Sequence, residues 1–247
     1  MRERMVGIQF ARPLVPGRFL RRLNRFAALV EVGGRREQVH VRTSGRLREL
    51  LVPGRPVLLE PADARNRSTR FTLALVRLSH GYVSADAHLA NALVAEALQR
   101  QAIPGFRGYR ILRREPAMGR NRADFLLARG KAQCILEVKS VTLVIGGVAL
   151  FPDAPTLRGR SHLAHLVALR QRGVRAGILF VIQRGDVKCF APNWDADPQF
   201  GEALHRASRS HVHVGALVCR VNPRVVRVDR PVPVRIGRRG SRRVRRM

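Results

Sequence analysis

Two carboxylates and one amine, Asp124, Glu137 and Lys139, stand in two short apolar stretches of the chain. Residues 122–129 and 132–139 are rich in the apolar side chains that favour strands. Only three of the 47 basic residues are lysines, and lysine supplies a compact point charge where arginine supplies a planar fork. Two acids beside such an amine are the groups that hold a divalent metal and stabilise the charge that develops during phosphodiester hydrolysis.

The spacing predicts how these groups meet. Gly130 begins the two-residue connection between the stretches, as in a tight hairpin whose first turn residue has a positive φ. If Arg129 pairs with Ala132, the register places Asp124 opposite Glu137, and facing like charges are destabilising. Side chains alternate along a strand, so Lys139 shares the face of Glu137 while its apolar neighbours point to the other side. A cation between the two acids would relieve the repulsion.

We therefore expect Mg²⁺ or Mn²⁺ to be held by Asp124 and Glu137, with Lys139 orienting a water or stabilising charge on phosphorus. Glu96, on the helix predicted just before this hairpin, is a candidate third ligand. Two simpler interpretations compete with this one. The Glu137–Lys139 pair would be an ordinary cross-strand ion pair, and Glu96 would be a solvated helix glutamate.

The formal charge of +30 arises from 47 basic and 17 acidic residues. Such a charge predicts a polyanionic partner, and nucleic acid fits it better than a membrane does. The positive charge is densest in residues 1–83, which hold 17 basic and six acidic residues, and in residues 235–247, which hold seven arginines and no acid. The arginines expected to contact DNA phosphates are Arg21, Arg22, Arg25, Arg158, Arg238, Arg239, Arg242 and Arg243.

Cysteine usage and hydropathy predict a cytoplasmic protein. The three cysteines are an odd count with no C-x-x-C spacing, which is typical of a reducing compartment. The first residues lack an apolar run of signal-peptide length, and no stretch approaches the roughly 18 apolar residues of a membrane helix.

Patterning divides the chain into two domains and a tail. Residues 1–83 contain closely spaced short strands, among them Met5–Phe10 and Arg18–Val32, which predict a small basic β-barrel such as an OB-fold. From about residue 84 helical spacing alternates with buried strands, which indicates an α/β domain over 84–234. Residues 235–247 form an arginine-rich segment that we expect to be disordered until it meets a polyanion.

Within residues 84–234, three helices are predicted near 87–101, 156–171 and 197–208. Residues 174–182 form a near-continuous apolar run typical of a buried strand, and 212–221 is the last long strand expected.

Several longer motifs resemble the sugar fermentation stimulation (SfsA) family. They are Glu137–Leu143, Gly147–Thr156, Arg158-Gly159, His162-Leu163, Leu179–Arg184, Phe190–Pro192, Asp197-Pro198, Gly17–Phe19 and Arg25-Phe26. The resemblance covers nearly the whole chain up to about residue 234. It implies an N-terminal OB-like domain, a C-terminal domain of the PD-(D/E)XK restriction-endonuclease-like superfamily, non-specific DNA binding and a link to maltose metabolism.

Carried onto this sequence, the superfamily's catalytic pattern matches Asp124, Glu137 and Lys139, and its helix-borne acid matches Glu96. The chain departs from the family pattern at Thr43–Leu47, and Ser161 stands where a lysine is usual.

Other candidate groups have plainer interpretations. His162 and His165 share a helix face without metal-site partners, so we interpret them as packed or solvent-exposed. Asp153 is interpreted as a helix-capping residue rather than a site residue. Among the few aromatic residues, Phe19, Phe26 and Trp194 are candidates for stacking on bases, although most aromatic side chains belong in the core.

Three functions remain open from the sequence. The first is a sequence-independent DNA-binding module of the SfsA type. The second is a Mg²⁺- or Mn²⁺-dependent nuclease acting through the hairpin site. The third is a basic protein associated with RNA or the ribosome.

Overall fold

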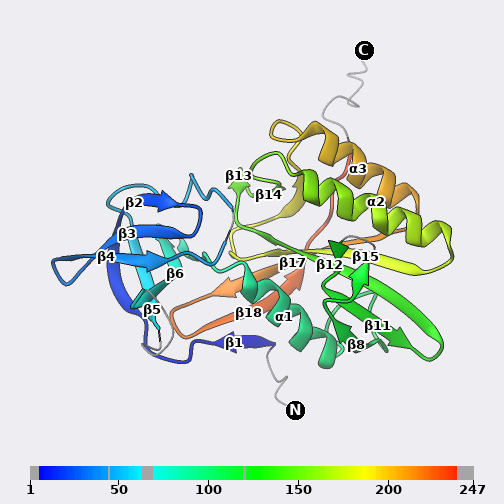
Figure 1. The fold of residues 1–247 in the computed structure, drawn as a ribbon, viewed down its shortest axis with the longest axis horizontal. Helices are drawn as coiled ribbons and strands as arrows, with labels where there is room; N and C mark the ends of the chain where they lie inside the picture. Colours follow the sequence, from blue (N-terminus) through cyan, green and yellow to red (C-terminus); the bar gives the residue numbers. More distant parts are fainter. Residues whose placement is uncertain (1–5, 44, 63–68, 119–120, 238–247) are drawn as a thin grey trace, which may run out of the picture.

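The computed structural model describes residues 6–43, 45–62, 69–118 and 121–237. In Figure 1 a barrel of strands stands on the left and a larger sheet with helices on both faces stands on the right. None of the described helices is both long and apolar enough to cross a membrane.

Five strands close into a small barrel because β4 pairs with both β3 and β6. Their inward positions alternate with exposed ones, and large apolar side chains such as Phe19, Leu59 and Leu73 fill the centre. A further strand, β7, extends the sheet beside β6. The strands are β2 (Val15–Asn24), β3 (Ala27–Val32), β4 (Arg35–His40), β5 (Pro56–Pro61), β6 (Phe71–Leu78) and β7 (Gly81–Ser84). The predicted OB-like barrel is confirmed.

The segment predicted as one strand over 18–32 is instead a hairpin. Asn24 pairs with Ala27, so Arg25 and Phe26 form a two-residue loop between β2 and β3. The prediction was wrong because no glycine or proline marks this turn. The side chain of Asn24 makes it instead, since its Oδ1 accepts a hydrogen bond from the Phe26 N–H at 2.8 Å.

The second domain is built on a seven-stranded mixed sheet in the order β1-β18-β17-β15-β12-β11-β8. Three parallel strands, β12, β15 and β17, form its centre, and antiparallel strands flank them. The bounds are β1 (Gly7–Gln9), β8 (Arg110–Arg114), β11 (Phe125–Arg129), β12 (Ala132–Val141), β15 (Arg175–Ile182), β17 (His213–Val221) and β18 (Val225–Pro231). Two smaller sheets are formed by β9 (Ala117–Met118) with β10 (Asn121–Arg122), and by β13 (Val144–Ile145), β14 (Val148–Phe151) and β16 (Cys189–Pro192).

Two strands at one end of the large sheet correct the predicted layout. The segment predicted as the first barrel strand contains β1, which pairs with β18 and so belongs to the second domain. The strand β18 itself was not predicted. Local patterning cannot tell which sheet a three-residue strand joins, because its partner lies more than 200 residues away in the chain.

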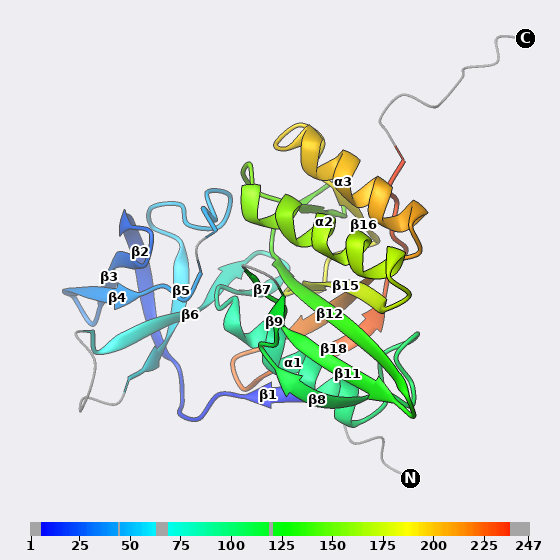
Figure 2. The ribbon, with the colours of Figure 1, turned by 45° about the vertical axis from the view of Figure 1, so that its right-hand side comes forward.

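Helices cover both faces of this sheet, as the two views of Figures 1 and 2 show. The helix α1 (His88–Gln99) packs on one face through residues that include Leu93 and Val94. On the other face lie α2 (Leu157–Gln171) and α3 (Pro198–Arg209). The helix starts of α2 and α3 are tied together. Asp197 caps α3 through the Phe200 N–H, and its second oxygen accepts from Thr156 N at 2.8 Å.

Candidate active site in the cleft between the domains

The hairpin of β11 and β12 forms in the predicted register. Phe125 pairs with Leu136 and Arg129 with Ala132, and Gly130 has a φ of +57° in the turn between them. Asp124 immediately precedes β11, and its Oδ2 accepts a hydrogen bond from the Val138 N–H at 2.7 Å. The two acids therefore meet at the same level of the sheet, as the spacing predicted.

The Glu137 carboxylate is buried and only half satisfied. Its side chain is 3% exposed, and its Oε1 accepts from both Lys139 Nζ and His162 Nδ1. Its Oε2 is buried and finds no hydrogen-bond partner in the part of the chain that the structure describes. A buried carboxylate oxygen without a partner is costly, so this atom marks a place where a cation or a water is expected.

Asp124 is held by two donors. Besides the Val138 N–H, Asn91 Nδ2 of α1 donates to Oδ1 at 2.8 Å. Burial, and then the neighbouring charge of Glu137, raise the pKa of Asp124 above its ordinary value. A nearby divalent cation would oppose both effects.

The pKa of Glu137 moves the other way. Burial acts to raise it, but the hydrogen bond from His162 and the charges of Lys139 and His162 outweigh burial and hold it below its usual range. Glu137 is thus kept ionised. Of the two acids, Asp124 has the higher pKa and takes up a proton first as the pH falls.

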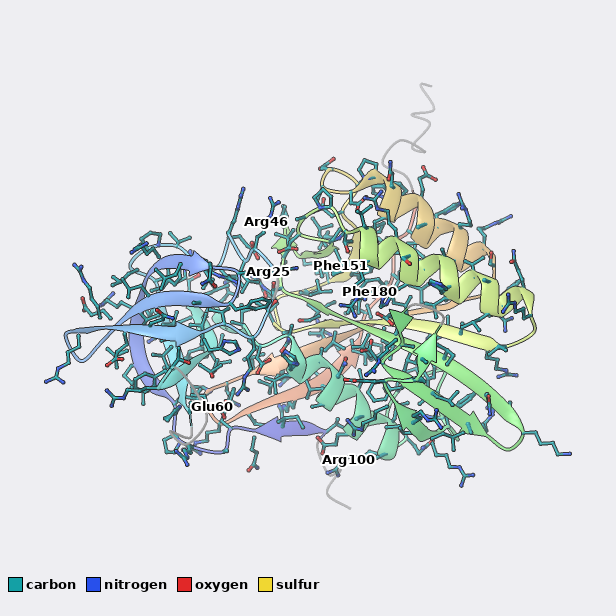
Figure 3. The ribbon with its side chains drawn as sticks, in the orientation of Figure 1. Arg25, Arg46, Glu60, Arg100, Phe151 and Phe180 are labelled. Carbon is teal, nitrogen blue, oxygen red and sulfur yellow. The ribbon has the colours of Figure 1, made fainter. Side chains whose placement is uncertain are left out.

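The two acids lie in a cleft of about 1030 Å³ to which both domains contribute. The barrel supplies the β2–β3 loop, Thr43 and residues 45–48, and the second domain supplies α1, β12 and the start of α2. Figure 3 shows Arg25 and Arg46 between the two bodies of the molecule, close to Phe151. Basic residues in the lining outnumber the acids Asp124, Glu137 and Asp153; they are Arg22, Arg25, Arg46, Arg48, Arg122, Lys139 and Arg158.

The predicted phosphate-binding arginines divide into four groups. Arg25 and Arg158 are exposed and line the cleft. Arg22 also lines it, but its guanidinium donates to the backbone carbonyls of Asn24, Arg25 and Thr43 and so braces the hairpin. Arg21 is exposed on β2 outside the lining. The tail arginines Arg238, Arg239, Arg242 and Arg243 lie outside the described residues.

Glu96 does not join the site, and the prediction that it is a third metal ligand is wrong. Its Oε2 accepts from the Gly7 N–H at 2.9 Å, and its Oε1 pairs with Arg100 Nη2 at 2.8 Å. The α1 residue that reaches Asp124 is Asn91. Five residues at about 100° each place Glu96 roughly 140° around the helix from Asn91, so both cannot face the same carboxylate.

Sequence reasoning missed two side chains that contact the site. His162 was interpreted as a packing residue, yet it donates to Glu137, and Arg158 Nε lies 3.4 Å from its Nε2. Asn91 carries no pattern of its own in the sequence. For His162 a signal was available, because His162-Leu163 is one of the motifs that resemble the SfsA family.

Asp153 also differs from its prediction. The cap of α2 is Thr156, whose Oγ1 accepts from the Gly159 N–H at 3.0 Å. Asp153 instead lines the cleft and accepts from the Arg46 N–H of the barrel at 2.7 Å. It therefore links the two domains across the cleft.

The residues present fit a hard divalent cation. Asp124 and Glu137 offer carboxylate oxygens, and no described residue hydrogen-bonds to Glu137 Oε2. Among the described residues no three His, Cys, Asp or Glu side chains converge as a complete ligand set. Mg²⁺ and Mn²⁺ do not need a complete set of protein ligands. They are usually held by one or two carboxylates, and waters and a phosphate oxygen fill the remaining positions.

Comparison with known proteins agrees with the two-domain organisation. The model described as SfsA N-terminal OB domain matches residues 20–85, and the one described as sugar fermentation stimulation protein RE domain matches residues 88–225. Sugar fermentation stimulation protein homologs from Caldanaerobacter subterraneus and Moorella thermoacetica are 41% and 42% identical, each over 90% of this chain and 97% of the relative. The solved structure of Pyrococcus furiosus SfsA in complex with Ca²⁺ is 30% identical, covers 94% of this chain and 99% of its own, and has a TM-score of 0.88. The chain belongs to the sugar fermentation stimulation protein family.

Proposed function

We propose that this protein binds DNA in the cleft between its domains, largely independently of base sequence. The observation that carries the proposal is the excess of arginines from both domains around one concave surface. Arginines of this kind contact phosphates and carry no sequence information by themselves. The formal charge of +30 adds long-range attraction for a polyanion.

Binding is tested by fluorescence anisotropy with labelled DNA of random sequence over a series of KCl concentrations. Each phosphate contact that is lost should reduce the slope of log affinity against log salt by about 0.9. We expect Arg25→Ala to weaken binding and reduce this slope. Arg21→Ala is the matched control, because Arg21 is an exposed arginine of the same hairpin outside the cleft lining. A shallow salt dependence in the unmodified protein would overturn the proposal.

A second function, hydrolysis of DNA phosphodiesters, is favoured by the unpartnered Glu137 Oε2 beside Asp124. Mg²⁺ or Mn²⁺ bound there would polarise the phosphate and lower the pKa of a bound water. Asp124 and Glu137 would hold the ion. Lys139, anchored on Glu137 Oε1, would orient the attacking water or stabilise the charge that develops on phosphorus. His162 would keep Glu137 ionised and oriented.

Hydrolysis is tested by incubating labelled DNA with the purified protein in Mg²⁺, Mn²⁺ or chelator, beside Glu137→Ala. Metal-dependent cleavage that disappears in Glu137→Ala establishes a nuclease. Equal cleavage by the wild type and by Glu137→Ala would come from a contaminant and would contradict hydrolysis at this site. Binding without cleavage would support the first function only. Parallel reactions with RNA test the third possibility, a protein associated with RNA.

Two cellular aspects belong to the same proposal. The three cysteines are free and buried, which fits a reducing compartment such as the cytoplasm. The family's name concerns sugar fermentation, and association with DNA offers a route by which such a protein would influence genes of sugar use, including those for maltose.

A further inference from the structure

We infer that the cleft receives an unpaired strand of DNA, and that Phe26 is a stacking platform for one of its bases. This inference rests on the proposed DNA binding and specifies its substrate. The observations that carry it are the exposure of Phe26, its place next to residues of the cleft lining, the rigidity of its loop, and the dimensions of the cleft.

Phe26 is the exposed one of the three aromatic candidates for stacking. Its side chain is 50% exposed, whereas Phe19 is 2% exposed in the barrel core. The indole nitrogen of Trp194 is buried, and its ring packs against Gly201. A single exposed apolar side chain is ordinary on a protein surface. Exposure alone therefore does not indicate a binding role for Phe26, and its position must be considered.

Phe26 directly follows two residues that line the cleft, Asn24 and Arg25, and is not itself part of the lining. The Arg25 guanidinium carbon lies 5.6 Å from the centroid of the Phe26 ring. An aromatic ring can stack on a base while a neighbouring arginine contacts a phosphate of the same strand.

The loop that carries Phe26 is held in place before any ligand arrives. The Asn24 side chain accepts from the Phe26 N–H, and the Val41 N–H donates to the Phe26 carbonyl at 2.8 Å. Arg22 donates to the carbonyls of both Asn24 and Arg25. A platform fixed in this way loses little conformational entropy when a base stacks on it.

A second exposed apolar side chain lies next to cleft-lining residues of the other domain. Leu157 is 78% exposed at the start of α2, and its neighbours Thr156 and Arg158 line the cleft. Phe26 on the barrel and Leu157 on α2 are thus each adjacent in the chain to residues of the lining. Apolar side chains placed in this manner contact base faces, and base faces are available only where bases are unstacked.

The dimensions of the cleft suit a single strand. The Glu137 side chain is 3% exposed, and the Asp153–Arg46 contact connects the two domains across the cleft. The cleft volume of about 1030 Å³ is at the upper end of the range of pockets for small molecules, roughly 300–1000 Å³. A few nucleotides of one strand fit such a volume, and a base can stack on a side chain only where it has left the stack of a duplex.

The test compares single-stranded and blunt duplex DNA of the same sequence as competitors for a labelled oligothymidylate. Wild type should prefer the single strand. Phe26→Ala should lose about 5- to 150-fold in affinity for the single strand and leave duplex affinity unchanged. Leu112→Ala is the control, because Leu112 is 47% exposed on β8 outside the cleft lining. Circular dichroism of each variant checks that it is folded.

A direct readout is the fluorescence of Phe26→Trp. The chain's one native tryptophan has a buried indole nitrogen, so quenching by single-stranded DNA that is absent in wild type would report stacking at position 26. Unchanged single-strand affinity in Phe26→Ala would overturn the inference while DNA binding itself stands. Absence of salt-dependent binding to either DNA would instead overturn the proposed function. Stronger competition by single-stranded RNA than by single-stranded DNA would overturn the assignment of the bound strand to DNA.

Discussion

At the scale of residues, the site is organised around one carboxylate with two different oxygens. Glu137 Oε1 is occupied by Lys139 and His162, while Oε2 has no hydrogen-bond partner among the described residues. This division fixes the orientation of one oxygen and leaves the other available to a ligand. The same donors keep the pKa of Glu137 low despite its burial. His162 therefore orients the Glu137 carboxylate and helps to keep it ionised.

The role of His162 predicts a loss of metal affinity when its N–H is removed. His162→Leu should weaken Mn²⁺ binding by about 10- to 100-fold, as changes in groups that support a metal ligand do. Isothermal titration calorimetry measures the affinity. His162→Asn should restore part of it, because an asparagine amide can place a donor near the position of Nδ1.

The matched control is His165→Leu, one turn further along the same helix, where the ring nitrogen lies 2.8 Å from the Ser161 carbonyl oxygen. Equal losses in the His162 and His165 variants would show a general effect on α2 rather than support of Glu137.

At the scale of elements, the hairpin of β11 and β12 sets the level at which the two acids meet. Its two-residue turn needs a positive φ at Gly130, and the observed value is +57°. Every pair along the hairpin follows from this turn, because a slip of one residue would send Glu137 to the face of α1. The turn is thus part of the site although it lies at the opposite end of the strands.

Substitution at this turn should destabilise the protein without touching the cleft. We expect Gly130→Ala to lower the free energy of unfolding by about 1–2 kcal/mol, the cost of a left-handed backbone for a residue with a Cβ. Urea unfolding measures it. Lys131→Ala, at the neighbouring turn position, should change stability by less than about 0.5 kcal/mol. Equal effects of the two substitutions would contradict the conformational explanation.

At the scale of the whole molecule, the function of the cleft depends on how the barrel and the second domain are joined. One connection is the Asp153–Arg46 contact. Another is formed where Asp186 accepts from Arg184 at 2.7 Å through each of its oxygens and lies 2.7 Å from His80 Nε2 of the β6–β7 turn. The Arg184 side chain is buried and also donates to the Thr142 carbonyl.

This second connection predicts a dependence of stability on pH. Burial acts to raise the pKa of Asp186, but the hydrogen bonds and charge of Arg184 outweigh it and hold the pKa below its ordinary value. Since the native pKa lies below the unfolded one of about 3.9, the ionised group stabilises the fold fully above that pH. The contribution is lost as the pH falls through the native pKa.

Urea unfolding between pH 3 and pH 7 should show Asp186→Asn less stable than wild type near neutrality, with the difference shrinking below about pH 4. Glu31→Gln provides a control, because Glu31 is an exposed acid on β3. A difference between wild type and Asp186→Asn that stays constant over this range would contradict the assignment.

The sequence by itself determined the register that brings the two acids together and the classes of the two domains. Turn length and strand alternation are local rules, so Gly130 and the spacing of Asp124, Glu137 and Lys139 were sufficient to predict the hairpin and its register. Strand patterning predicted the barrel, and motif resemblance added the restriction-endonuclease-like class of the second domain. The excess of arginine predicted a polyanion but could not tell which arginines face it.

Tertiary structure alone decided which distant groups complete the site. It brought His162 and Asn91 to the two acids, turned Glu96 away toward Gly7 and Arg100, and joined Asp153 to Arg46 across the cleft. These contacts depend on how α1 and α2 rotate and pack on the sheet and how the barrel docks beside it. The orientation of each helix is set by how its apolar face packs against the sheet. The spacing of residues within one segment does not specify that packing.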